Sequence, residues 1–300
     1  MKGIKKIWYN GKFLDFKKAK IHLLSHALHY GSAVFEGIRA YQTERGTAVF
    51  RLDDHLKRLF FSASVLKIKI PFSLQELKKA ILKTIILNKQ KECYIRPIVF
   101  YGEGEMGLYP KNSKIDISII TWPWGKYLGK EGVKVKTSRF IRLHPASVEI
   151  RAKVSGYYVN SIFASLEAKS KGYDEALLLD YRGFVAEGPG ENIFMVKNKK
   201  VFTPSLGSIL PGITRDTVFH ILKDLKIPFK EKDISLKELK DADELFFTGT
   251  AVEICPIFQV DQKKINQGRL GPLSKIVKET YERIVHGKEK KYLKWLTFVN

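Results

Sequence analysis

Four stretches of the chain are richer in glycine, polar side chains and ionisable groups than a packed core requires. They are HALHYGSAVFEGIRAY, CYIRP, AKVSGYYVNS and EGPGENIF, which occupy residues 26–41, 93–97, 152–161 and 187–194. Their lysine, glutamate and tyrosine side chains are groups that proton transfer and covalent catalysis use, and their arginines can bind anions. We therefore expect the functional groups of the protein in these stretches.

Two further stretches place glycine and threonine where backbone N–H groups face an anion. LPGITRD, at residues 210–216, leads straight into a predicted helix, and TGTAVEI occupies residues 248–254. The amides and the dipole at a helix N-terminus favour a phosphate or a carboxylate. Taken alone, however, PGIT is better explained by Thr214 as the residue that caps the helix.

Several common catalytic motifs are not supported. GEGEMG, at residues 102–107, lacks the lysine of a Walker loop, and we expect neither a P-loop nor a Rossmann dinucleotide site. The metalloprotease H-E-x-x-H and the hydrolase G-x-S-x-G are absent. His22, His26 and His29 have the spacing of metal ligands on one helix face, but no acidic residue or fourth ligand lies nearby. We expect these histidines to pack, and no metal site.

Periodicity predicts the elements that must position these residues. Apolar residues at helical spacing predict helices over 52–67, 74–87, 157–170, 214–225, 236–241 and 273–286. A hairpin is predicted over 7–14, turning at Asn10-Gly11. Short apolar runs predict further strands over 94–101, 115–121, 133–137, 176–179, 184–187, 192–196, 200–203 and 244–248. We expect a small α+β domain over 1–121, an interdomain loop over 122–132 and a larger domain with a curved, largely antiparallel sheet over 133–300.

Composition sets aside other classes of protein. With 300 residues, 44% of them hydrophobic, the chain can bury a sizeable core. Its formal net charge of +22 suggests a nucleic-acid or polyanion-binding protein, but the lysines are scattered, and the densest group lies at residues 288–294. Two cysteines are too few for a disulfide scaffold. Because the lysines are scattered, we expect no nucleic-acid partner. Since no apolar run is long enough for a membrane span or a signal peptide, we also expect a cytoplasmic protein that binds no membrane.

Taken in order, the six stretches resemble the branched-chain amino acid aminotransferases, which are fold-type IV enzymes that use pyridoxal 5′-phosphate (PLP). The resemblance extends over nearly the whole chain. It implies a two-domain mixed α/β fold, in which the curved sheet of the larger domain forms a pseudo-barrel. It also implies amino transfer between leucine, isoleucine or valine and 2-oxoglutarate, in a homodimer or a higher homo-oligomer.

The same resemblance assigns the cofactor contacts residue by residue. The lysine of the family's AK-x-x-G stretch, which bonds covalently to PLP, matches Lys153. The glutamate beside the pyridine nitrogen matches Glu187, and the tyrosine facing the phenolic oxygen matches Tyr158. A leucine that packs on the ring and four phosphate-binding residues match, in this order, Leu210, Arg58, Ile213, Thr214 and Thr250.

The substrate contacts follow in the same way. The resemblance implies an aromatic wall for the aliphatic side chain, formed by Phe35, Tyr30, Trp124 and Tyr127. Arg96 would receive the distal carboxylate of glutamate or 2-oxoglutarate. The α-carboxylate would lie against Thr250 and Ala251, assisted by Tyr94, and a neighbouring subunit would contribute Leu108. One departure is Tyr157, where the family often has asparagine.

Other activities occur on the same fold. D-amino acid transaminases, (R)-amine transaminases and aminodeoxychorismate lyases are the alternatives. EGIRAY and YIRP together favour the branched-chain enzyme. A non-catalytic polyanion-binding protein is the alternative from a different class, and only the net charge supports it.

Overall fold

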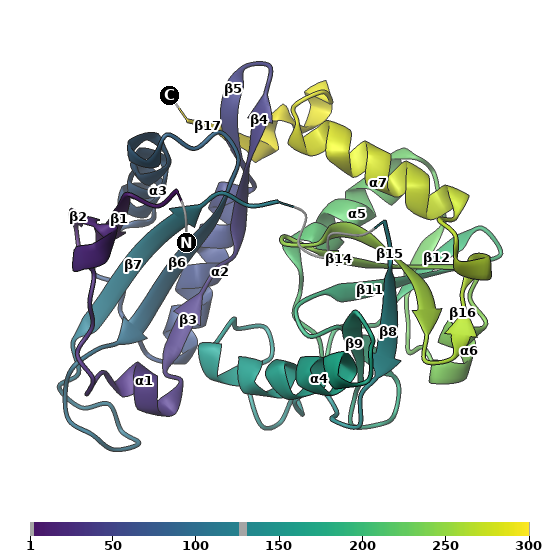
Figure 1. Ribbon diagram of the computed structural model, residues 1–300, viewed down its shortest axis with the longest axis horizontal. Coiled ribbons are helices and arrows are strands. Elements are labelled where there is room, and N and C mark those ends of the chain that lie inside the picture. Colours follow the sequence, from purple (N-terminus) through teal and green to yellow (C-terminus); the bar gives the residue numbers. More distant parts are fainter. Residues whose placement is uncertain (1–2, 126–130, 300) are drawn as a thin grey trace. The chain divides into compact units, whose positions relative to one another are not determined.

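The computed structural model describes residues 3–125 and 131–299. The chain forms two units, and each of them is assembled from separate segments (Figure 1). The first unit comprises Met1–Gly125, Ala152–Tyr157 and Ile284–Asn300, and the second comprises Lys126–Arg151 and Tyr158–Arg283. The sequence predicts one boundary at residues 122–132, whereas the chain also returns to the first unit twice.

The sheet of the first unit is antiparallel throughout. Its strands follow the order β17-β5-β4-β6-β7-β1-β2, and β3 pairs with β6 off this path. Their bounds are β1 Lys6–Tyr9, β2 Lys12–Asp15, β3 Ala33–Phe35, β4 Ile38–Thr43, β5 Gly46–Phe50, β6 Cys93–Tyr101, β7 Ile115–Trp122 and β17 Leu296–Phe298. The predicted hairpin is confirmed: Asn10 and Gly11, both at positive φ, turn the chain between β1 and β2.

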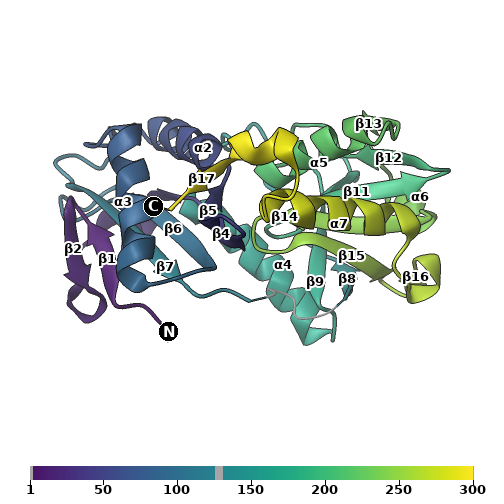
Figure 2. The same ribbon diagram turned by 90° about the horizontal axis from the view of Figure 1, so that it is seen from above.

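Helices α2 (Leu52–Val65) and α3 (Leu74–Asn88) cover one face of this sheet (Figure 2). Helix α3 begins at a capping box in which Ser73 and Glu76 each accept the other's backbone N–H. Both helices bury residues three or four positions apart against the strands, namely Leu52, Leu56, Leu59, Ala63, Leu77, Ile81 and Ile85. A shorter helix, α1, spans His26–Tyr30.

Backbone pairing explains why two distant segments join the first unit. Strand β17 pairs with β5, with Leu296 opposite Phe50. Val154 forms a bridge to Val34, and the N–H of Phe35 donates to the carbonyl of Lys153 at 3.1 Å. These long-range pairings leave no local signal in the sequence.

The second unit contains a closed barrel. Its sheet follows the order β10-β9-β8-β15-β14-β11-β12-β13, and β10 also pairs with β11, which closes a ring of six strands. The bounds are β8 Val133–Thr137, β9 Glu175–Leu179, β10 Val185–Glu187, β11 Asn192–Lys197, β12 Lys200–Thr203, β13 Phe229–Glu231, β14 Glu244–Gly249, β15 Glu253–Val260 and β16 Lys263–Lys264. Strand β8 is parallel to β9 and β15, and β12 is parallel to β13. The other strand pairs are antiparallel, so the sheet is mostly antiparallel. The predicted pseudo-barrel is confirmed.

The helices of this unit are α4 (Tyr158–Ser170), α5 (Ile213–Asp224), α6 (Leu236–Lys240) and α7 (Pro272–Val285), whose last two residues belong to the first unit. The barrel interior is apolar and includes Val133, Val135, Leu177, Ile193, Leu245 and Ile257. None of the helices in the described parts of the chain is both long and apolar enough to cross a membrane.

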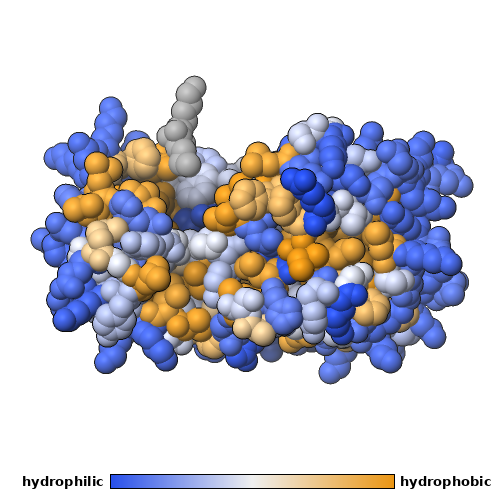
Figure 3. Space-filling view, turned by 90° about the horizontal axis from the view of Figure 1, so that it is seen from below, coloured by the Kyte–Doolittle hydropathy of each residue, from blue (hydrophilic) through white to orange (hydrophobic). Residues whose placement is uncertain are grey.

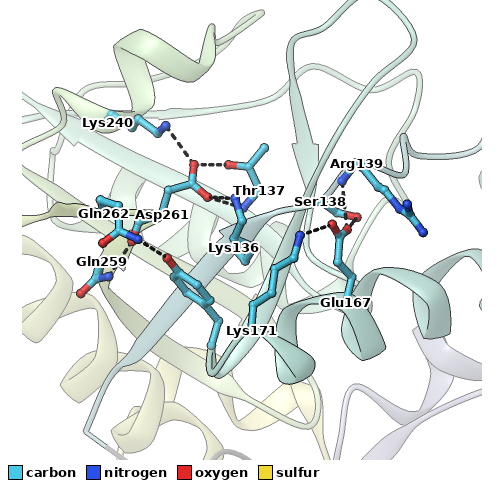
Figure 4. A network of polar contacts seen from close by, with 11 residues as sticks. Lys136, Thr137, Ser138, Arg139, Glu167, Lys171, Lys240, Gln259, Asp261 and Gln262 are labelled. Atoms are coloured by element: carbon cyan, nitrogen blue, oxygen red, sulfur yellow. Dashed lines mark hydrogen bonds and ion pairs between the residues drawn. The ribbon is translucent and has the colours of Figure 1, made fainter.

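A polar network fixes the end of strand β8 (Figure 4). The carboxylate of Asp261 accepts hydrogen bonds from the Nζ of Lys136, from Lys240, and from the N–H and hydroxyl of Thr137. Burial acts to raise the pKa of Asp261, but the hydrogen bonds from Lys136 and Lys240 hold it below its ordinary range. Beyond the strand, Glu167 on α4 accepts from the Ser138 hydroxyl and the next backbone N–H. The segment that follows β8 therefore starts from a fixed position.

Candidate active site

Lys153 lies in a loop that is anchored on both sides of its backbone. Its N–H donates to the hydroxyl of Ser62 on α2 at 2.9 Å, and its carbonyl accepts from Phe35. Its Nζ lies 5.1 Å from the centroid of the Phe35 ring. The loop holds the main chain in place, so the amine at the end of the half-buried side chain is the part that can reorient.

Two glycines allow this loop to approach α1. The N–H of Gly156 donates to the carbonyl of Gly31 at 3.1 Å, and Gly31, at φ 67°, ends α1. A Cβ atom on Gly31 would lie 2.7 Å from the Cα of Gly156. No other residue fits position 31 without moving the segment that carries Lys153. The neighbouring Tyr157 packs against the core of the first unit.

Arg58 is held by a buried carboxylate. Its Nε and Nη2 donate to the two oxygens of Glu36 at 2.6 and 2.9 Å, and the Nδ1 of His55 lies 2.7 Å from Glu36 Oε2. Burial acts to raise the pKa of Glu36, but the charge of Arg58 and the contact with His55 keep it below its ordinary range. Burial also lowers the pKa of His55, against the opposing effect of Glu36. Arg58 thus presents a fixed guanidinium that stays charged.

Arg96 lies in a box of aromatic rings. Its guanidinium carbon is 4.5 Å from the centroid of Phe35, 5.4 Å from Tyr94 and 5.9 Å from Trp122. Its Nη2 is 3.4 Å from the Tyr94 hydroxyl, and its buried Nε has no hydrogen-bond partner in the described parts of the chain. The Trp124 ring lies 4.8 Å from that of Tyr94. A half-buried cation among aromatic rings, with a buried Nε–H that no described residue accepts, suits an incoming carboxylate.

The other predicted substrate residues of the first unit lie at its surface. Tyr30 is 44% exposed and Leu108 is 87% exposed. The ring of His26 contacts the Tyr30 ring. The two ring nitrogens of His26 form hydrogen bonds with Ser32 Oγ and Gly107 O, each at 2.7 Å. The expectation that the three histidines pack is confirmed for His26 and wrong for His22 and His29, which are exposed. Tyr127 lies outside the described residues.

Glu187, the residue predicted to lie beside the ring nitrogen of the cofactor, is buried in the second unit. It ends strand β10, and its side chain is only 5% exposed. The Nε of Arg142 donates to Glu187 Oε1 at 2.7 Å, and the Nδ2 of Asn192 donates to Oε2 at 3.0 Å. The N–H of Leu210 donates to Oε2 at 3.2 Å. Sequence reasoning missed Arg142 entirely, since it belongs to no recognised stretch.

The segment from Leu210 leads directly into helix α5. Asn192 Nδ2 also donates to the carbonyl of Leu210, and a Cβ atom on Gly212 would lie 2.1 Å from Asn192 Oδ1. Gly212 is the N-cap residue of α5, without a side-chain cap, so the explanation of Thr214 as the cap is wrong. Thr214 is instead buried in the first turn. The N-terminal end of α5 at Ile213 is the end of a helix that favours an anion.

The remaining predicted residues belong to elements next to Glu187. Asn192 pairs with Glu187 on one side and with Thr248 of β14 on the other. Thr250 and Ala251 lie two and three residues further on, in the turn that joins β14 to β15. Helix α4 begins at Tyr158. In the part of the chain that the structure describes, no three His, Cys, Asp or Glu side chains are placed to hold a metal ion.

Comparison of the chain with known proteins identifies its family. The family model described as amino-transferase class IV matches residues 33–260. The branched-chain-amino-acid aminotransferase of Pseudomonas aeruginosa is 44% identical over 98% of this chain and 97% of its own. The crystal structure of the branched-chain aminotransferase of Thermoproteus uzoniensis with norvaline has a TM-score of 0.95 at 44% identity, covering 98% of this chain and 99% of that chain. The T.th. branched-chain amino acid aminotransferase, complexed with N-(5′-phosphopyridoxyl)-L-glutamate, has a TM-score of 0.96 at 42% identity, covering 99% of both chains.

These matches and the closed barrel define a class IV aminotransferase. Within that class, the chain belongs to the family of branched-chain-amino-acid aminotransferases. The family expected from the six sequence stretches is confirmed.

Proposed function

We propose that this protein uses PLP to move the amino group of leucine, isoleucine or valine to 2-oxoglutarate. The observation that carries the proposal is in the second unit, where the buried Glu187 carboxylate is hydrogen-bonded to the segment that opens α5. The polar ends of PLP are a pyridine nitrogen and a phosphate dianion. A carboxylate and a helix N-terminus are suited to bind these two groups.

The residues present fit this cofactor. Glu187 would hold the proton on the ring nitrogen, and Tyr158 would face the phenolic oxygen. Leu210 would pack on the ring. The phosphate would be bound by cationic, hydroxyl and amide donors from Arg58, Ile213, Thr214 and Thr250. When bound, the cofactor would supply an electron sink for the negative charge that develops at the substrate Cα.

Lys153 is the proposed nucleophile and general acid/base. Its amine would bond to the aldehyde carbon of the cofactor in the resting enzyme. After the substrate amine displaces it, the released Lys153 would take the proton from the substrate Cα and deliver it to the cofactor carbon C4′. The fixed backbone on either side of Lys153 supports this role, since the amine must return to one position in each half-reaction.

The aromatic box around Arg96 suits a site that must accept two kinds of side chain. Phe35 and its aromatic neighbours offer an apolar wall to a branched aliphatic group. Arg96 would receive the distal carboxylate of glutamate or 2-oxoglutarate, and its Nε, which is buried and has no partner among the described residues, supports this. The relatives bound to norvaline and to a phosphopyridoxyl-glutamate carry ligands of these two kinds. Thr250, Ala251 and Tyr94 would receive the α-carboxylate.

A second copy of the chain is the proposed partner. Apolar residues on one face of α4, namely Val159, Ile162, Phe163 and Leu166, are each 50–62% exposed, and Figure 3 shows apolar side chains gathered there. On the first unit, Leu108 and Tyr109 are also highly exposed. Exposed apolar surfaces of this kind mark interfaces. We propose a homodimer or higher oligomer in which Leu108 of one copy completes the site of another, in a cytoplasmic enzyme.

Assays with four substrates test the proposed activity. The expected result is transamination of L-leucine with 2-oxoglutarate, and much weaker turnover of D-alanine, an (R)-amine and aminodeoxychorismate. Preference for one of the last three substrates would show that the protein has one of the alternative activities known on the same fold. A colourless protein that PLP cannot reconstitute, and that heparin retains at high salt, would instead favour polyanion binding.

A further inference from the structure

Arg142 forms a close ion pair with the Glu187 carboxylate. The Arg142 Nε and Glu187 Oε1 are 2.7 Å apart, and the two side chains are only 8% and 5% exposed. Removing two charges from water carries a desolvation penalty that the attraction of an ion pair does not always offset. The contribution of this buried ion pair to folding stability is therefore not enough to explain why it lies at this position.

Three residues donate to the two carboxylate oxygens of Glu187. Arg142 donates to Oε1 and Asn192 Nδ2 donates to Oε2, while the N–H of Leu210 lies 3.4 Å from Oε1 and 3.2 Å from Oε2. These donors come from three different parts of the chain, so the plane of the carboxylate is fixed. A positive guanidinium at this distance also favours the charged form of the carboxylate.

Arg142 extends this network to helix α4. Its Nη1 lies 3.3 Å from Asn160 Oδ1, and Asn160 Nδ2 donates to the Ile141 carbonyl at 2.9 Å. Asn160 is in the first turn of α4, which begins at Tyr158. One guanidinium therefore connects the carboxylate proposed for the ring nitrogen with the helix that carries the phenol proposed for the phenolic oxygen.

The backbone of Arg142 is itself fixed. Its N–H donates to the carbonyl of Leu179 at 2.7 Å. The segment leading to it leaves β8 through the network in Figure 4, where Asp261 holds Thr137 and Glu167 holds Ser138. Arg142 thus reaches Glu187 from a main chain that hydrogen bonds hold on both sides of residue 139.

We propose that Arg142 is a positioning residue that keeps Glu187 charged and oriented toward the pyridine nitrogen of PLP. This inference rests on the proposed function. Because the guanidinium stabilises the carboxylate, the proton shared by Glu187 and the ring nitrogen stays on the nitrogen. Without Arg142, that proton moves toward Glu187, and the ring withdraws less charge from the substrate Cα.

Variants of Arg142, reconstituted with PLP labelled with ¹⁵N in the ring, test the proposal by NMR. The wild-type signal is expected to be that of a protonated nitrogen. Arg142→Met is expected to shift it toward the unprotonated value, and Arg142→Lys, which keeps the charge, is expected to restore it. The first half-reaction with leucine should slow by about 10–100-fold in the Met variant, which is the usual effect of removing a residue that orients a catalytic group. KM for leucine should change little.

Arg139→Met is the matched control. Arg139 lies on the same segment, is exposed, and contributes only its backbone N–H to the network in Figure 4, so neither the NMR signal nor the rate should change. In a Glu187→Gln background, Arg142→Met should have no further effect on the rate. If Arg142→Met does not fold, Arg142→Gln, which keeps a donor without the charge, replaces it.

Two outcomes would overturn the proposal. One is a protonated ring nitrogen and an unchanged half-reaction in the uncharged variant. The other is equal loss of bound PLP in the Met and Lys variants with an unchanged signal in the molecules that retain it, which would indicate a merely structural role. Failure of the proposed function differs from both, since the wild-type protein would then neither bind PLP nor transaminate leucine.

Discussion

At the scale of a single residue, Arg96 is the side chain proposed to distinguish the two kinds of substrate. Arg96→Met would keep an apolar wall for leucine and remove the charge that faces a distal carboxylate. We expect kcat/KM for 2-oxoglutarate to fall about 10–100-fold, because a hydrogen bond to a charged group contributes about 1.5–3 kcal/mol. The leucine half-reaction, measured separately by single turnover, is the internal control and should change little. An equal loss in both half-reactions would refute the assignment of Arg96.

The buried His55 side chain should make folding stability depend on pH. Burial lowers its pKa below the ordinary value of 6.5, so below that pH the unfolded chain binds a proton that the folded chain does not. Folding stability should therefore fall on acidification. Glu36, whose pKa is also lowered, adds a loss at still lower pH. Urea unfolding at pH 7.5 and 5.5 should show a smaller loss in His55→Gln than in wild type; equal losses would contradict this.

Single residues also set the limit of sequence-based prediction. Arg96 and Glu187 stand in glycine-punctuated stretches, which point to a site without assigning roles. Lys153 is one lysine among many, and the family resemblance alone selected it. Arg142 could not be found, because its role depends on a contact 45 residues away along the chain.

The approach of the Lys153 loop to α1 gives a prediction at the scale of elements. Gly31→Ala would place a Cβ 2.7 Å from Gly156 Cα, so either the loop or α1 must move. Gly172→Ala is the matched control, since Gly172 also has positive φ, at 77°, but an added Cβ would meet nothing within 4 Å. We expect the control to lose only about 1–2 kcal/mol of stability from the left-handed conformation. Gly31→Ala should lose more stability and most of its activity.

Thermal unfolding and the leucine assay measure both effects. The account of the loop requires the two variants to differ in activity, with Gly172→Ala close to wild type. Equal activities would show that the close approach of Gly31 to Gly156 does not position Lys153.

Elements with a clear local period could be predicted from the sequence. The hairpin at Asn10-Gly11, helices α2 to α7 and strand β8 all appear near their predicted bounds. Strand β15 was not predicted, and its Pro256 explains why, since proline argues against a central strand. Pro256 is tolerated because pairing with β8 begins only at Ile257.

At the scale of the whole molecule, the division into units depends on pairings that no local pattern encodes. The chain changes unit near residue 125, close to the predicted loop. Residues 152–157 return to the first unit through the bridge between Val34 and Val154, and the C-terminal segment returns through β17. Neither return to the first unit has a signal in the composition of the chain.

The proposed oligomer gives a prediction at the same scale. Ile162→Asp on the exposed face of α4 should shift the protein toward the monomer, because a buried carboxylate without a partner opposes association. Ile276→Asp, on α7, introduces the same change at another exposed helical position and should leave the oligomer intact. Light scattering after size exclusion measures both. A monomeric wild type, or dissociation by both variants alike, would contradict the α4 interface.

Borohydride reduction of the PLP-loaded protein, followed by peptide mapping, tests the central claim most directly. Reduction makes the bond between the cofactor and its lysine permanent, so the labelled peptide identifies the residue. The account predicts a single pyridoxyl label, on Lys153. A label on another lysine, or no label at all in protein that transaminates leucine, would contradict it.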